Sequence, residues 1–164
     1  MSGSMTIPTA AAERVARLLI QRRQTLAVSE SSAGGLVSAM LLSVPGASAY
    51  FLGGGIIYTG AAREGLLGVT PTMMAGIRSA TEEMSRLLAR TVRERLGADW
   101  GLAETGATGP AGNRYGDAAG HCCLAVDGPH RASRTLETGS ADRMANMVTF
   151  AGAALALLEE QLAR

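Results

Sequence analysis

Hydroxyl and carboxyl side chains gather in the stretch SESSAGG (29–35), where a short apolar run is followed by two glycines. A serine at such a turn can act as a nucleophile when a neighbouring base accepts its proton. Alternatively, glycines at the start of a helix let backbone N–H groups bind an anion. The third interpretation is capping of the helix by Ser31 or Ser32. The stretch lacks the first glycine of a G-x-S-x-G elbow and the lysine of a P-loop, so these three alternatives stay open.

A second possible nucleophile, Ser48, follows the Pro-Gly break at 45–46, with Tyr58 and Arg63 within the next fifteen residues. A serine that attacks an amide needs a base or a lowered pKa. Tyr58 could relay a proton, whereas Arg63 is a poor base because the pKa of arginine exceeds about 12. The alternative is a surface serine beside aromatic residues of the core. A further glycine-rich turn, TGATGPAGNRYG (105–116), could present N–H donors to an anion.

Short apolar strands alternate with amphipathic helices along the chain, which predicts the α/β class. The clearest helix is 81–97, because Thr81 caps its start and Gly97 ends it. We expect a single three-layer α/β/α domain with a mixed sheet over 9–164, after a flexible N-terminus (1–8). Ligands of such folds bind next to the carboxyl ends of the strands. The expected helices are 9–23, 34–44, 60–69, 81–97 and 142–164, and the expected strands are 25–29, 53–59, 99–104 and a hairpin around DGPH (127–130).

Composition and charge exclude several classes of function. The formal net charge of +1, with only two Phe, three Tyr and one Trp, gives little for binding nucleic acid. No apolar run reaches the roughly 18 residues needed to cross a bilayer, and the start lacks the layout of a signal peptide, which favours the cytoplasm. The adjacent Cys122 and Cys123 should face opposite sides of a strand, so we expect neither a disulfide nor a metal site. No cofactor is expected.

Three blocks of the sequence, taken together, resemble a known family. They read TLAVSESSAGGL (25–36), VPGASAYFLGGGIIYTGAAREGLLGV (44–69) and GADWGLAETGATGPAGN (97–113). Their order and spacing are similar to those of the CinA C-terminal-domain family, the nicotinamide-nucleotide amidases also called PncC. The resemblance covers most of the chain and implies a compact α/β/α domain that hydrolyses nicotinamide mononucleotide to nicotinate mononucleotide and ammonia. The expected partner is a small pyridine nucleotide, with a homo-oligomer as a further possibility.

The same resemblance implies roles for individual residues. Ser48 would be the preferred nucleophile, Ser31 the second candidate, and Tyr58 the residue that orients or relays a proton. Arg63, at the position of the family lysine, counts among the catalytic residues. In the amide hydrolysis that we expect, Arg63 or Arg143 would hold the phosphate. The residues that would line the pocket are Glu30, Gly34, Gly35, Thr105 and Gly106.

The chain also departs from the family pattern around the expected pocket. Arg63 replaces a lysine, Gly60 an asparagine, Ser32 a cysteine and Glu104 a small or apolar residue, and the loop 113–119 loses its lysine. A shielded lysine can lose its proton and activate a serine, whereas an arginine cannot at ordinary pH. Three interpretations therefore stay open. Either amide hydrolysis survives with another base, or the domain is a non-catalytic nucleotide or small-anion binder. The third is an oligomeric partner domain whose pocket is vestigial.

Overall fold

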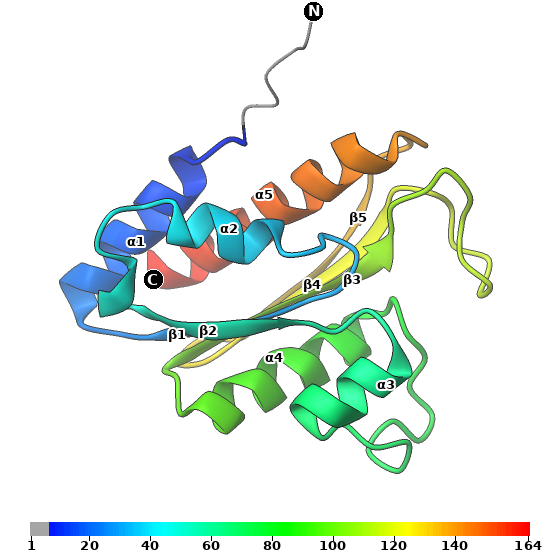
Figure 1. Cartoon of the computed structure of the whole chain (residues 1–164), viewed down its shortest axis with the longest axis horizontal. Helices are drawn as coiled ribbons and strands as arrows, with labels where there is room; N and C mark the ends of the chain where they lie inside the picture. The colour runs from blue at the N-terminus through cyan, green and yellow to red at the C-terminus, as the bar shows by residue number, and fades with distance from the viewer. Residues whose placement is uncertain (1–6) are drawn as a thin grey trace, which may run out of the picture.

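The computed structural model describes residues 7–164; the predicted flexible segment 1–8 lies outside this range except for its last two residues. The elements in chain order are α1 (Ala10–Arg22), β1 (Leu26–Glu30), α2 (Leu36–Leu42), β2 (Phe51–Ile56), α3 (Gly60–Ala62), α4 (Glu82–Leu96), β3 (Trp100–Ala107), β4 (His121–Asp127), β5 (Ala132–Glu137) and α5 (Arg143–Leu162). The strands form one sheet in the order β2-β1-β3-β4-β5, with helices on both faces (Figure 1). β1, β2 and β3 are parallel, and β4 and β5 add antiparallel pairs. This confirms the predicted α/β class and its mixed sheet.

The two faces of the sheet carry side chains of different size. Helices α1, α2 and α5 cover one face of the sheet (Figure 1). Leu26, Leu102 and Leu124 belong to the larger core cluster, together with residues of these helices. On the other face, Ala103 and Ala125 pack under α4 in a smaller cluster. Because side chains alternate along a strand, the central strands β1, β3 and β4 supply residues to both clusters. The small residues under α4 let this helix approach the sheet closely.

The strand order gathers several loops at one edge of the sheet. Since β1, β2 and β3 are parallel, the segments that follow them meet at their carboxyl ends, together with the start of α5 (right-hand side of Figure 1). Helix α2 carries the chain back to the opposite edge, where a short 3₁₀ turn (Ala47–Ala49) precedes β2. The carboxyl edge is the place at which ligands bind in folds of this kind.

Local sequence signals set the ends of the helices. Thr81 caps α4 by accepting the Met84 N–H at 3.2 Å, and Gly97 ends the helix with a left-handed φ of +65°. Asp142 caps α5 by accepting the Ala145 N–H at 3.0 Å. These caps confirm the predicted helix at 81–97 and the predicted start of the last helix.

Two predicted elements differ from the structure. The expected helix 60–69 is a short α turn, α3, that continues as a π-helix over Arg63–Leu67. The glycine-rich turn expected at 105–116 begins later than predicted, because Thr105 and Gly106 belong to β3 and pair with Cys123 and Cys122 of β4. The antiparallel hairpin of β4 extends β3 by these residues, which the apolar pattern of 99–104 alone did not indicate.

The two cysteines are buried free thiols in β4. Cys122 belongs to the cluster under α1, α2 and α5, whereas the Cys123 thiol lies 3.6 Å from the His121 ring, so the two side chains face opposite sides as expected. Within residues 7–164, no three His, Cys, Asp or Glu side chains are grouped closely enough to hold a metal ion. None of the helices in this range combines the length and the apolarity that a membrane span requires.

His121 of β4 contacts both the end of β5 and the segment before α4. Its Nδ1 contacts the Glu137 carboxylate and its Nε2 lies 2.8 Å from the Ala80 carbonyl oxygen, so both ring nitrogens face acceptors. An imidazole donates from both nitrogens only when it is protonated. Burial alone would lower the pKa of His121, but the hydrogen bonds to Glu137 and Ala80 and the negative charge of Asp117 outweigh burial and raise it.

We therefore predict that the unfolding free energy contains a contribution from His121 that depends on pH. Because its folded-state pKa is raised, this contribution is complete below about pH 6.5 and is lost as the pH rises through the folded value. Urea unfolding at several pH values between about 6 and 9 should show this fall in the wild type, and His121→Gln should remove that part of the slope. Equal slopes in the two proteins would contradict the prediction.

Candidate functional site

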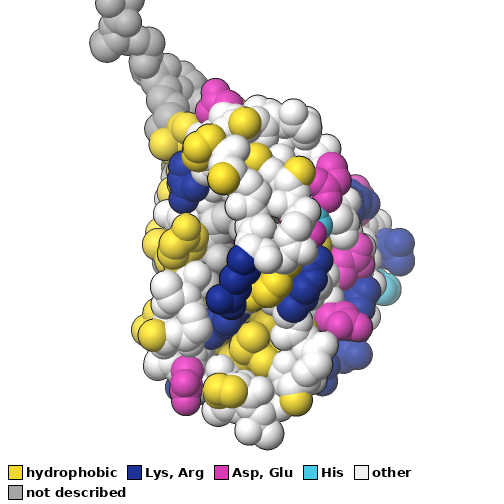
Figure 2. All heavy atoms as spheres, turned by 90° about the vertical axis from the view of Figure 1, so that its right-hand side faces the viewer, with side chains coloured by type: hydrophobic (Ala, Val, Ile, Leu, Met, Phe, Trp, Pro, Cys, Tyr) yellow, Lys and Arg dark blue, Asp and Glu magenta, His cyan; other side chains and the backbone are white. Residues whose placement is uncertain are grey.

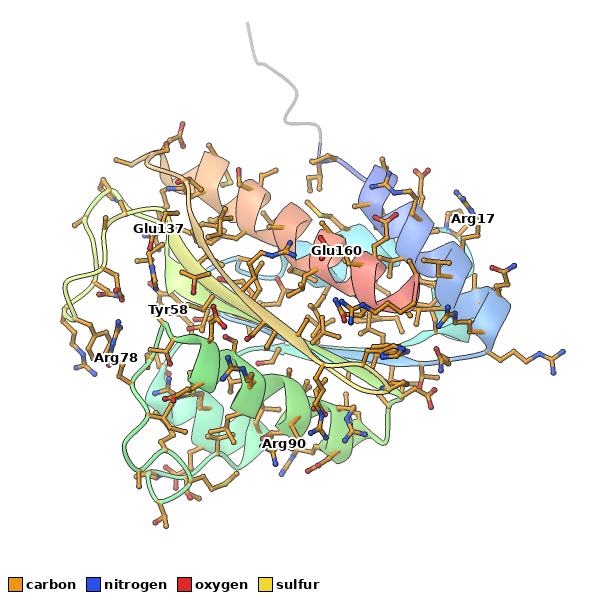
Figure 3. All side chains as sticks on the ribbon, turned by 180° about the vertical axis from the view of Figure 1, so that it is seen from behind. Arg17, Tyr58, Arg78, Arg90, Glu137 and Glu160 are labelled. Atoms are coloured by element: carbon orange, nitrogen blue, oxygen red, sulfur yellow. The ribbon has the colours of Figure 1, made fainter. Side chains whose placement is uncertain are left out.

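A pocket of about 240 Å³ opens at the carboxyl edge of the sheet. One wall is the segment 106–113, from the end of β3 into the glycine-rich loop, and the other residues are Ser32, Tyr58 and Arg143. Ser32 follows β1, Tyr58 follows β2, and Arg143 is the first residue of α5. The pocket therefore joins four segments that are far apart in the sequence. Figure 3 labels Tyr58 at this edge of the sheet.

The rim of the pocket carries donors suited to an anion. Arg143 donates from Nη1 to the Gly109 carbonyl oxygen at 2.5 Å and from Nη2 to the Tyr58 hydroxyl at 3.4 Å, which holds the guanidinium over the loop. Within residues 7–164, no backbone carbonyl of a turn or loop accepts the N–H groups of Thr108, Gly109, Ala111 and Gly112. Free amides beside a guanidinium form a site for phosphate or carboxylate.

Glu30 does not line this pocket, which corrects its predicted role in substrate binding. Its side chain is 1% exposed and accepts the backbone N–H groups of Gly35, Val37 and Ser38 at 3.1, 2.9 and 2.8 Å. The amides that we predicted for a ligand at the start of α2 are therefore already bound by a carboxylate of the protein. Gly34 and Gly35 form the turn with left-handed φ values of +67° and +100° and are not pocket residues either.

Glu104 binds the other half of the same turn. One of its carboxylate oxygens accepts the N–H groups of Ser31 and Ala33 at 3.0 and 2.9 Å, and the other accepts the hydroxyl of Ser32. The side chain is 1% exposed. Burial raises the pKa of Glu104, and the nearby charge of Glu30 raises it further, against the hydrogen bonds from residues 31–33. Ser32 and Glu104 both depart from the family pattern, and the hydrogen bond between them is not evident from their positions in the sequence.

The structure brings most of the remaining predicted residues to this edge. Tyr58, Gly106 and Arg143 line the pocket, and Thr105 lies one residue before Gly106 in β3. Ser31 lies in the turn next to Ser32, and its backbone N–H is bound by Glu104.

Ser48, the preferred nucleophile among the predicted residues, does not lie at this edge of the sheet. It lies in the 3₁₀ turn that precedes β2, and β2 begins beside the start of β1, where Phe51 pairs with Leu26. Ser48 is therefore at the amino edge of the parallel strands, opposite the pocket. Its position before rather than after the predicted strand was a sequence signal for this placement. Within one chain the structure does not bring Ser48 together with Tyr58 or Arg143.

Arg63 lies outside the pocket, in a second cavity of about 300 Å³ that also includes Gly60, Pro71 and Met74. Its Nη1 donates to the Ser79 hydroxyl at 2.8 Å. A Cβ added at Gly60 would lie 3.7 Å from the Arg63 Nη2, so a bulkier residue there would extend toward the guanidinium. The two departures at positions 60 and 63 are thus neighbours in space.

A group of cations lies beside the pocket on the same face of the molecule. Arg78 makes two hydrogen bonds to Asp117, at 2.7 and 3.1 Å, and the Cζ atoms of Arg78 and Arg114 each lie 5.1 Å from the centre of the Tyr115 ring. Figure 2, which looks onto this edge, shows arginine side chains on both sides of apolar ones. The loop 113–119 is therefore held to the segment before α4 by charge and by cation–π contact.

The fold and the pocket define a class of α/β/α domain with a mixed sheet and a ligand site at the carboxyl ends of its parallel strands. A family model described as the CinA C-terminal domain matches residues 8–162. The chain belongs to this family.

Individual proteins of known sequence or structure agree with this membership. The chain is 34% identical over 152 residues to a CinA-like protein of Desulforapulum autotrophicum, covering 92% of this chain and 36% of that protein. It is 42% identical over 113 residues to a CinA-like protein of Prochlorococcus marinus, covering 69% of this chain and 26% of that protein. The chain thus spans only about a third of the curated relatives that it matches.

Solved structures give the same result. A competence-damaged protein (CinA) superfamily protein from Klebsiella pneumoniae superposes with a TM-score of 0.87 at 27% identity, covering 93% of this chain and 96% of that one. A superfamily member from Enterobacter cloacae also has a TM-score of 0.87 at 27% identity, covering 99% and 96%. The predicted family and its fold are therefore confirmed.

Proposed function

We propose that the domain is an amidohydrolase that converts nicotinamide mononucleotide and water to nicotinate mononucleotide and ammonia. The observation that supports this most is the pocket of about 240 Å³, which is lined both by Ser32 and by the anion-binding donors of its rim. The substrate needs both, because it carries a carboxamide at one end and a phosphate at the other. Family membership supports the same reaction, through the resemblance described above.

Each end of the substrate has a proposed place. The phosphate lies at the rim, bound by Arg143 and by the free amides of the loop 108–112. The carboxamide enters toward Ser32, which also lines the pocket. The pocket is smaller than the roughly 300–1,000 Å³ usual for ligand pockets, so part of the nucleotide stays exposed.

The test is ammonia release from nicotinamide mononucleotide, in the wild type and in Arg143→Ala. Loss of a charge-assisted hydrogen bond costs about 1.5–3 kcal/mol, so we expect KM to rise roughly 10- to 150-fold while kcat changes little. Nicotinamide riboside lacks the phosphate, and its KM should be similar in both proteins. Arg164→Ala, which changes an exposed arginine at the end of the chain, is the matched control.

Absence of ammonia release in the wild type would refute the proposed reaction. In that case a second function is favoured by one observation: Arg63, which replaces the family lysine, donates to Ser79 and cannot serve as a base. The domain would then be a non-catalytic nucleotide or small-anion binder. Thermal stabilisation by nicotinate mononucleotide or phosphate, without turnover, would identify it as such.

A further inference from the structure

Among the serines of the carboxyl edge, Ser32 has both access to the pocket and a carboxylate partner. It lines the pocket with 6% of its surface exposed, and its hydroxyl donates to a Glu104 oxygen. Because the other Glu104 oxygen is fixed by the N–H groups of Ser31 and Ala33, the carboxylate has little freedom to turn away from this hydroxyl. A serine with a fixed base as neighbour has the geometry of an activated nucleophile.

The environment of Glu104 suits the role of a base. Its side chain is buried, and burial raises its pKa above the ordinary value of a carboxyl group, with a further increase from the charge of Glu30. A base is most effective when its pKa approaches the working pH, so a carboxylate with a raised pKa takes a proton more readily than an exposed one. The Cys122 thiol lies 3.9 Å from the Glu104 oxygen that accepts the Ser32 hydroxyl. It adds no negative charge there, because burial raises the pKa of this thiol well above its usual value.

The other candidate nucleophiles and bases lack access to the pocket, a carboxylate partner or the ability to accept a proton. Ser29 is fully buried, and its hydroxyl has no partner within residues 7–164. Ser31 contacts Glu104 only through its backbone N–H. Ser48 lies at the opposite edge of the sheet, and Arg63 cannot accept a proton at ordinary pH.

We infer that Ser32 is the nucleophile and Glu104 the general base of the amide hydrolysis proposed above, on which this inference rests. These are two of the positions at which the chain departs from the family pattern, and they contact each other directly. The pair supplies the proton acceptor that the change from lysine to Arg63 removes.

The reaction then proceeds in two balanced steps. Glu104 takes the Ser32 hydroxyl proton as the Ser32 oxygen bonds to the carboxamide carbon; the C–N bond breaks, and the proton passes to the departing nitrogen, which leaves as ammonia. In the second step Glu104 takes a proton from water, whose oxygen attacks the acyl ester. The ester C–O bond breaks, Ser32 recovers its proton, and the acid product leaves.

A fluorophosphonate probe tests the pair without depending on the identity of the substrate. It should label Ser32 in the wild type, as located by peptide mass spectrometry, and the labelling rate should fall at least tenfold in Glu104→Gln. In the wild type the rate should rise with pH through a single ionisation above the ordinary carboxyl range, because Glu104 must be unprotonated to act. Labelling at Ser31 or Ser48, or no labelling of the folded protein, would overturn the inference. The pH profile keeps the test valid if Glu104→Gln fails to fold.

Ammonia release separates this inference from the proposed function. Ser32→Ala and Glu104→Gln should each lower kcat/KM for nicotinamide mononucleotide at least 100-fold, whereas Ser43→Ala, which removes a hydroxyl bound to the Met40 carbonyl in α2, should not. If the wild type releases ammonia and Ser32→Ala releases it equally fast, the inference fails and the function stands. If the wild type labels at Ser32 but releases no ammonia, the proposed substrate fails while the activated pair is supported.

Discussion

Replacing Gly101 by alanine is expected to lower the melting temperature by about 10 °C. A Cβ at this position in β3 would lie 2.0 Å from the Ala89 carbonyl oxygen and 2.8 Å from the Arg93 Cβ, both in α4. The carbonyl belongs to the helix backbone and cannot rotate away, so α4 would have to move off the sheet. Overpacking of this kind costs about 3 kcal/mol, and each kcal/mol corresponds to roughly 2–4 °C in a chain of this size.

Gly152→Ala is the matched control for this substitution. Gly152 lies within α5, and a Cβ there would meet no atom within 4 Å. Because alanine favours helix by about 1 kcal/mol over glycine, this variant should be slightly more stable than the wild type. Thermal and urea unfolding of both variants measure the difference. A Gly101→Ala protein as stable as Gly152→Ala would show that α4 does not lie against β3 as described.

Glu30→Ala is expected to lower the free energy of unfolding by about 3 kcal/mol, because it leaves the N–H groups of Gly35, Val37 and Ser38 without an acceptor. The lost charge also relieves its repulsion of Glu104, which offsets part of the cost. Glu30→Gln keeps one carbonyl oxygen as an acceptor, so it should fall between Glu30→Ala and the wild type.

The control for this series is Glu94→Ala, at a carboxylate with 61% of its side chain exposed, which should change the stability by less than about 0.5 kcal/mol. Urea unfolding monitored by circular dichroism gives all four free energies. If Glu30→Ala were no less stable than Glu94→Ala, the role assigned to the buried carboxylate would be wrong.

Local sequence patterns were sufficient to predict most of the fold. Thr81 and Gly97 mark the ends of α4 through their own backbone chemistry, and the turn signal after Asp127 marks the hairpin of β4 and β5. The π-helix over Arg63–Leu67 was not predictable in this way, since its apolar residues also fit an ordinary helix. The need for glycine at position 101 was not predictable from local sequence either, because it arises only when α4 packs across β3 in the folded domain.

The candidate site was predicted less well, for reasons that lie in the topology and in the long range of its contacts. Ser48 and Tyr58 are ten positions apart, yet β2 separates them and places them at opposite edges of the sheet. The hydrogen bond from Ser32 to Glu104 joins residues 72 positions apart. The sequence around Glu104 does not indicate which turn its carboxylate will bind. It therefore marked Ser32 and Glu104 as unusual residues but not as hydrogen-bond partners.

The two buried carboxylates, Glu30 and Glu104, preorganise the turn beside the pocket before a ligand binds. Glu30 and Glu104 together bind five backbone N–H groups between Ser31 and Ser38, so this turn is held in place by the protein itself. A ligand entering the pocket loses its own freedom and that of the exposed Tyr58 side chain, but it need not order the turn behind Ser32. Preorganisation of this kind reduces the conformational entropy lost on binding, and it keeps the Ser32 hydroxyl aligned before any ligand arrives.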